Sequence, residues 1–187
     1  MSKLLKKTEF GNQILRNVNV SLSDSEIGSV EIQHIINDMY YTLELKKYGV
    51  GIAAPQVGKN IAISTIDTKP TPTRPDIKRE KLTIINPVIL KTYGHTEPMW
   101  EGCISGSKLY AKVPRHTKIL LKWKDEKAKE HEKVFEGFLA HVIQHEVDHL
   151  NGVLFVDKVV DTKSYMTFSE YKKMRKIEKR QHTIDSK

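Results

Sequence analysis

The chain has 187 residues, of which 39% are hydrophobic and 29% charged, and this balance suits one soluble domain, 1–187, with a sizeable core. Without a run of about 18 apolar residues or a signal-like N-terminus, we expect no membrane contact and no secretion. One cysteine excludes an internal disulfide and favours a reducing compartment, so we expect a cytoplasmic protein. The net charge of +8 indicates either an acidic partner such as RNA or the ribosome, or general basicity.

The first predicted element is an amphipathic helix near the N-terminus. Apolar side chains recur at intervals of three and four residues between Ile32 and Leu43. Asp24 or Ser25 can cap the start of this helix, and Gly49 marks its latest end. The apolar face is expected to lie in the core.

Short β-branched runs predict strands at residues 61–66, 82–85, 119–123 and 133–135. A segment with prolines at 70, 72 and 75 separates the first two runs and is expected to be an exposed loop. The turn-forming residues 125–127 separate the last two, which should therefore pair as antiparallel neighbours. This order favours an α+β fold with mostly antiparallel sheets.

Two more helices are expected in the C-terminal third. One spans 138–150 and ends at Asn151-Gly152, a favourable left-handed cap. After a strand-like run at 153–156, a basic helix spans 164–182, with an apolar stripe formed by Phe168, Tyr171, Met174 and Ile177. Its basic face is interpreted as solvated, with a docking surface as the alternative.

The most informative segment is His145-Glu146-Val147-Asp148-His149, within the helix predicted at 138–150. Residues four apart share one helix face, so the two imidazoles can bind one divalent metal ion. Glu146 lies beside that site, where a carboxylate can act as a general base toward water. The expected fold has the sheets packed around this helix as a central metal-binding element.

A catalytic site of this type needs a third protein ligand and an open position. Downstream, Glu170 would complete the site of a zinc endopeptidase, although the helix ends directly after the motif. Upstream, Cys103 lies in the segment 101–105 beside Gly102, and a thiolate is a strong, soft ligand. A lone cysteine is by itself more often a small buried hydrophobe. Another segment is therefore needed to decide whether Cys103 is a metal ligand.

That segment is Gly49-Val50-Gly51-Ile52-Ala53-Ala54-Pro55-Gln56. Its glycines and alanines leave little side-chain bulk, so its backbone can approach an extended peptide. Gln56 can donate an amide N–H to a developing oxyanion.

Together, the three segments resemble the peptide deformylase family. Its motifs are Gly-x-Gly-Leu-Ala-Ala-Pro-Gln, Glu-Gly-Cys-Leu-Ser and Gln-His-Glu-x-Asp-His, matched here in order at 49–56, 101–105 and 144–149. Ile52 and Ile104 replace the leucines. Further similarity lies at 10–16, 86–87 and 113–115, so the motif-bearing part covers about 10–157.

The resemblance implies that Cys103, His145 and His149 bind one divalent metal ion. In this family the ion is typically Fe²⁺, and Zn²⁺, Ni²⁺ or Co²⁺ can take its place. The implied reaction is hydrolysis of the N-formyl group from N-formylmethionyl nascent peptides, which releases formate.

The same resemblance assigns roles around the metal. Glu146 would transfer the proton, and the Gln56 amide and the Ile104 backbone N–H would stabilise the oxyanion. Substrate contacts are implied for four residues: Val50, Gly51, Gly102 and Val142. Asp148 is expected to support the site from behind, in a network with Glu101 and Arg115.

Three residues depart from the usual pattern. Ser107 and Tyr110 stand where many bacterial members have a proline and a peptide-binding arginine, so we expect a raised KM for formylated tripeptides. His141 stands where an aliphatic residue is usual, and it is interpreted as a pocket-wall or hydrogen-bonded residue rather than a fourth ligand.

Two alternatives to an active deformylase remain at this level. One is a zinc endopeptidase that uses Glu170, and the other is a catalytically weak, ribosome-associated protein of deformylase type. The basic terminal helix could also dock an active enzyme on the ribosome, whereas no direct DNA binding is expected.

Overall fold

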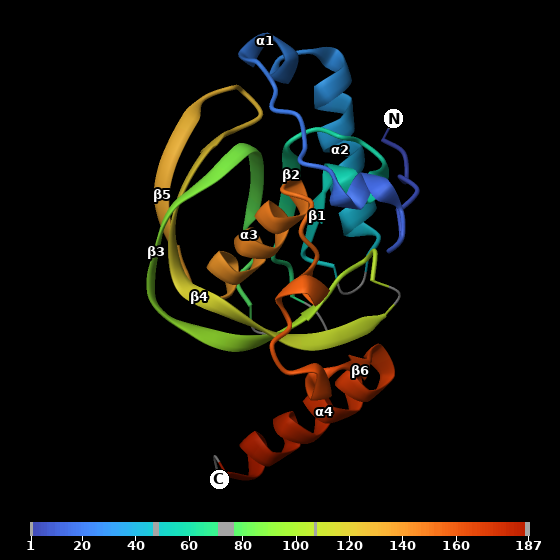
Figure 1. Ribbon diagram of the computed structural model, residues 1–187, viewed down its shortest axis with the longest axis vertical. Helices are drawn as coiled ribbons and strands as arrows, with labels where there is room; N and C mark the ends of the chain where they lie inside the picture. Colours follow the sequence, from blue (N-terminus) through green and yellow to red (C-terminus); the bar gives the residue numbers. More distant parts are fainter. Residues whose placement is uncertain (1, 47–48, 71–76, 107, 186–187) are drawn as a thin grey trace.

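The computed structural model describes residues 2–46, 49–70, 77–106 and 108–185. An antiparallel sheet and a central helix dominate the molecule (Figure 1). The four α-helices described are α1 (Asp24–Ile27), α2 (Val30–Glu44), α3 (Gly137–Leu150) and α4 (Phe168–Asp185). None of the helices in these ranges is long and apolar enough to cross a membrane.

The six-stranded sheet runs in the order β1-β2-β3-β4-β5, with β6 paired to β4. Its strands are β1 (Gly51–Ala53), β2 (Ile63–Asp67), β3 (Lys81–Gly102), β4 (Leu109–Lys124), β5 (Glu130–Glu136) and β6 (Met166–Thr167). Every pair of neighbouring strands is antiparallel, which confirms the predicted α+β class. The predicted pairing across residues 125–127 is also confirmed, as β4 with β5.

β3 and β4 are much longer than the runs that predicted them. Asn86-Pro87 resembles the end of a strand, but Asn86 takes a positive φ of 50° and the register shifts between Ile85 and Val88, so β3 continues through a bulge. Beyond that point many side chains of β3 are exposed, so the apolar alternation that marks a half-buried strand is missing.

Two serines divide the first predicted helix. Ser23 accepts a hydrogen bond from the Glu26 amide and caps α1, and Ser29 accepts one from the Ile32 amide and caps α2. The predicted caps at Asp24 or Ser25 were therefore wrong, since the cap of the longer helix is Ser29, five residues after Asp24 and four after Ser25.

Two C-terminal predictions also need correction. The strand-like run 153–156 leads into a 3-10 helix at Phe155–Lys158, because the Asp157 carboxylate accepts a hydrogen bond from the Leu154 amide and caps a turn. The last helix begins at Phe168 rather than at Ser164, because 166–167 pair with β4 first. Of the predicted proline loop, 71–76 lie outside the described residues.

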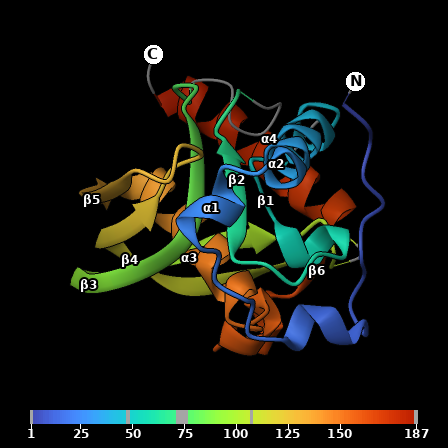
Figure 2. The same ribbon diagram turned by 90° about the horizontal axis from the view of Figure 1, so that it is seen from above.

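α3 lies at the centre of the molecule, wrapped by β3, β4 and β5 on one side and by β1 and β2 on another (Figures 1 and 2). Ala140, Ile143 and Val147 of α3 pack in one buried cluster with apolar side chains of β2, β3 and β4. Each buried aliphatic side chain contributes about 1.5–3 kcal/mol to stability. The central position of α3 thus places its metal motif in the buried interior.

α4 leaves this body and carries the C-terminus away from it (Figure 1). The Phe168 amide donates a hydrogen bond to the carbonyl oxygen of Lys108, at 2.8 Å, and β6 pairs with the start of β4. Of the predicted stripe, Tyr171 is buried at 6% exposure, whereas Ile177 is 63% exposed. Only the first turns of α4 therefore contact the core.

Candidate metal centre

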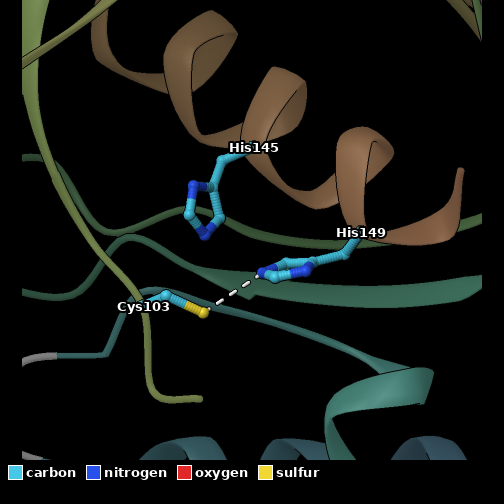
Figure 3. A group of neighbouring side chains, drawn as sticks. All are labelled: Cys103, His145 and His149. Atoms are coloured by element: carbon cyan, nitrogen blue, oxygen red, sulfur yellow. Dashed lines mark hydrogen bonds between the residues drawn. The ribbon is translucent and has the colours of Figure 1, made fainter. Parts of the chain in front are cut away.

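Cys103, His145 and His149 converge in the interior (Figure 3). Cys103 follows the last residue of β3, and the two histidines lie one turn apart on α3. One ligand atom from each of the three lies within 4.8 Å of the others, and Cys103 Sγ is 3.2 Å from His149 Nε2. The structure therefore brings the upstream cysteine, 42 residues from His145 in the sequence, to the histidine pair.

The electrostatics of the cluster suit a thiolate ligand. Burial by itself would raise the pKa of the Cys103 thiol, but the adjoining His149 and His145 imidazoles lower that pKa to about 5. The thiolate is the form that binds a metal. A borderline or soft divalent ion matches a set of one sulfur and two imidazole nitrogens.

A buried carboxylate orients the first histidine. Glu101 Oε2 accepts a hydrogen bond from His145 Nδ1 at 2.7 Å, which leaves Nε2 free to face the cluster. Burial would raise the pKa of Glu101, but the His145 charge and hydrogen bonds from His141, His145 and Arg115 hold it well below its ordinary value. Glu101 is therefore a stable acceptor, and it fixes the tautomer of His145.

The predicted network of Asp148, Glu101 and Arg115 is confirmed. Arg115 donates to Glu101 from Nε at 2.6 Å and from Nη2 at 3.1 Å, and to Asp148 Oδ2 from Nη1 at 2.5 Å. Arg115 is only 4% exposed, so its charge depends on these two carboxylates. The guanidinium ties β4 to the end of β3 and to the back of α3.

His141 belongs to this same network. Its Nε2 lies 2.8 Å from Glu101 Oε1, and burial lowers the pKa of its imidazole. The group of side chains able to hold a metal contains Cys103, His145 and His149 but not His141, as far as the described residues extend. The interpretation as a hydrogen-bonded wall residue agrees with this geometry.

Glu146 of α3 lies against the glycine-rich segment. A Cβ added to Gly51 would fall 2.2 Å from Glu146 Oε1, so the carboxylate rests directly on the glycine backbone. Glu146 Oε2 is buried and has no hydrogen-bond partner among the described residues. Burial raises the pKa of Glu146 to about 7, which suits a group that must both accept and release a proton near neutral pH.

Gln56 is held so that its amide donor faces the sulfur. Its Oε1 accepts the Ala53 backbone N–H at 2.8 Å, and its Nε2 donates to Cys103 Sγ at 3.0 Å. The side chain is 2% exposed. This fixed orientation places a hydrogen-bond donor at the edge of the metal cluster.

A pocket opens beside the cluster, and the predicted substrate-contact residues and Ile104 line it: Val50, Gly51, Gly102, Val142 and Ile104. Its wall also contains aromatic residues, among them Trp100, Tyr110 and Tyr171. The sequence signal for Tyr171 was its place in the apolar stripe, but that periodicity predicted only packing. Ser107 lies outside the described residues.

Glu170 does not belong to the group of metal ligands found among the described residues. It lies on α4 with its side chain 58% exposed and forms an ion pair with Lys173 at 2.7 Å. Among the described residues, the metal-competent group does not include it. The third ligand required by a zinc endopeptidase of the expected type is therefore absent from this part of the chain.

Comparisons with known proteins agree with this geometry. A family model described as polypeptide deformylase matches residues 5–165. A peptide deformylase from Leptospira biflexa is 38% identical over 167 residues, which cover 87% of this chain and 90% of the relative. One from Cytophaga hutchinsonii is 39% identical over 160 residues, or 82% and 81% of the two chains.

Solved structures show the same likeness. The Met-Ala-Ser-bound class I type b peptide deformylase from Acinetobacter baumannii superposes with a TM-score of 0.81 at 34% identity. The match covers 85% of this chain and all of the other.

Proposed function

Because the chain belongs to the peptide deformylase family, whose members remove the formyl group from nascent polypeptides, we propose that Cys103, His145 and His149 hold the metal ion of such an enzyme. The observation that carries this proposal is the approach of the three ligand atoms to within 4.8 Å. Three protein ligands leave a fourth position open, as catalytic sites require. Cys/His/His ligation suits Fe²⁺, our proposed ion, and admits Zn²⁺, Ni²⁺ or Co²⁺.

A divalent ion held there would lower the pKa of a water molecule to about 7 and so supply a nucleophile at neutral pH. Glu146 then takes a proton at its carboxylate during attack on the formyl carbon and delivers it to the leaving amine nitrogen. The raised pKa of this carboxyl, about 7, supports both halves of that transfer. The products are formate and a free N-terminal amine.

Two donors are proposed to stabilise the oxyanion. The Gln56 amide is already locked by the Ala53 backbone, so it needs no reorganisation when charge develops. Ile104 follows the cysteine directly and lines the same pocket, so its backbone N–H is the second proposed donor. Each such donor contributes about 3 kcal/mol to transition-state stabilisation.

The substrate is proposed to be an N-formylmethionyl peptide. Val50 and Val142 would contact the methionine side chain, and Gly51 and Gly102 would admit the peptide backbone. The likeness to the Met-Ala-Ser-bound Acinetobacter enzyme supports this class of ligand.

The test combines anaerobic metal analysis with formate release from formyl-Met-Ala-Ser. The wild-type chain should contain one metal ion and release formate, and Cys103→Ala should lose both. Proteolysis that survives Cys103→Ala would instead favour an endopeptidase. Ribosome binding without any formate release by the metal-loaded wild type would favour a silent binding protein.

We further propose that the enzyme works in the cytoplasm, on chains leaving the ribosome, and that α4 docks it there. Lys172, Lys173 and Lys176 are exposed on α4, which supports contact with phosphate groups. The double variant Lys172→Glu/Lys176→Glu should co-sediment less with ribosomes, with a smaller salt dependence, and keep its formate release. Lys127→Glu/Lys129→Glu, in the β4–β5 turn, is the control with the same change in net charge, and equal co-sedimentation of all three proteins would contradict docking through α4.

A further inference from the structure

The last helix contributes to the wall of the substrate pocket. Tyr171, near the start of α4, lines the pocket together with Gly51, Gly102 and Glu146. It is the one buried side chain among those of α4 that the structure describes. None of the three motifs includes Tyr171, and it lies beyond residue 165, where the family match ends.

Tyr171 is held there by an aromatic cluster that we define as Trp100, Tyr110, Phe168 and Tyr171. Tyr110 stacks on Tyr171 with ring centroids 4.3 Å apart and planes 15° apart, and on Phe168 at 5.4 Å and 18°. Trp100 meets Tyr171 at 5.8 Å and 59°. Aromatic pairs of this kind contribute about 0.5–1.5 kcal/mol each beyond the burial of area.

Strand pairing holds the start of α4, and with it Tyr171, beside the pocket. Tyr110 pairs with Gly102 on one side, in β3, and with Met166 on the other side, in β6. α4 begins directly after β6, β6 pairs with β4, and β4 pairs with the end of β3 that leads to Cys103. Its first turn cannot leave the pocket without breaking that pairing.

The cluster also covers the backbone along which a substrate would extend. A Cβ added to Gly102 would fall 2.3–2.6 Å from ring atoms of Tyr110, so the ring lies directly on the glycine that precedes the cysteine ligand. A peptide laid beside Gly102 therefore meets aromatic carbon here.

We propose that Tyr171, together with Tyr110, determines specificity by forming an aromatic wall that favours an aromatic side chain at the second or third residue of the formylated peptide. This inference rests on the proposed function and adds to it a preference for one residue of the substrate after the formylmethionine. Stacking on a ring rewards aromatic side chains, whereas an arginine at the position of Tyr110 would reward acidic or carbonyl groups. α4 thus serves as part of the peptide-binding site.

The test compares formate release from formyl-Met-Ala-Ser, formyl-Met-Phe-Ser and formyl-Met-Ala-Phe. For the wild type, one of the phenylalanine peptides should have a KM about 3- to 10-fold lower than the alanine peptide, with similar kcat. Tyr171→Ala should abolish that difference, and Tyr171→Phe should keep it. Ile177→Ala, at an exposed position of the same helix, is the matched control and should behave as wild type.

Tyr171→Leu is the control for misfolding of the alanine variant, because it keeps an apolar side chain at the position but removes the aromatic face. It should retain its metal and the circular dichroism spectrum of the wild type and still lose the preference for phenylalanine. A wild-type enzyme with equal KM for all three peptides, or a Leu variant with the full preference, would overturn the inference. A metal-loaded wild type that releases no formate from any peptide would contradict the proposed function instead.

Discussion

α3 and α4 carry similar ion pairs in opposite surroundings. On α3, Asp148 meets Arg115 at 2.5 Å in the interior, whereas on α4, Glu170 meets Lys173 at 2.7 Å in solvent. Arg115 is 4% exposed and Lys173 is 70% exposed. Contact distance therefore says little about energy, because burial decides what breaking a pair costs.

The two helices also differ in what holds them. α3 is surrounded by sheet, and hydrogen bonds join its catalytic face to Glu101 through His145 and its back to Arg115 through Asp148. α4 is attached through its first turn, by an aromatic stack and a short strand. Changes on α3 should therefore alter chemistry and stability together, whereas changes along most of α4 should alter neither.

The largest expected contrast is between two glutamates. Glu146→Gln on α3 should lower kcat about 10²- to 10⁴-fold, because the amide cannot take the proton, while the metal content stays at the wild-type level. Glu170→Gln on α4 should leave kcat unchanged. Formate-release kinetics with metal analysis measure both, and similar rates for the two variants would contradict the role given to Glu146.

A second contrast concerns stability. Arg115→Met should lower the free energy of unfolding by about 3–5 kcal/mol, because it removes the buried guanidinium that Glu101 and Asp148 share. Lys173→Met breaks an exposed pair and should cost about 0.5 kcal/mol or less. Urea unfolding of metal-loaded protein measures the difference, and equal losses would show that burial does not distinguish these pairs.

Close packing on the catalytic face of α3 gives a third test. Gly51→Ala places a methyl group where Glu146 Oε1 now lies, so the carboxylate must move and kcat should fall up to about a hundredfold. Gly28→Ala is the control, because its Cβ would meet its nearest atom at 3.6 Å, an ordinary contact. An active Gly51→Ala enzyme would mean that the position of Glu146 is not critical.

The smallest effect concerns a pair of intermediate burial, Asp67 with Arg79. Burial raises the pKa of Asp67, but the hydrogen bond and charge of Arg79 outweigh it, so the folded-state pKa lies below the ordinary 3.8. The pair therefore stabilises the fold fully above about pH 4, by about 1 kcal/mol, and this contribution is lost as the pH falls through the folded-state pKa. The stability gap between wild type and Asp67→Asn should be constant from pH 7 to 5 and shrink toward pH 3.

Local patterns predicted α3 closely. Helical spacing and the Asn151-Gly152 cap indicated 138–150, and α3 spans Gly137–Leu150. Prediction was poorer where context overrides local preference: a bulge carries β3 through Asn86, and a side-chain cap turns the apolar run before Asp157 into a 3-10 helix. Neither the bulge nor the cap produces a periodic pattern of hydrophobic residues in the sequence.

By itself, the sequence determined the chemistry that depends on short spacing: two imidazoles on one helix face, a carboxylate beside them and segments of little side-chain bulk. The tertiary structure decided the contacts between distant segments: Cys103 reaching the histidines, Glu101 shared by Arg115 and His141, and Tyr171 of the last helix lining the pocket. The physical reason is that helical periodicity places neighbours in the chain, whereas strand register and packing bring distant segments together.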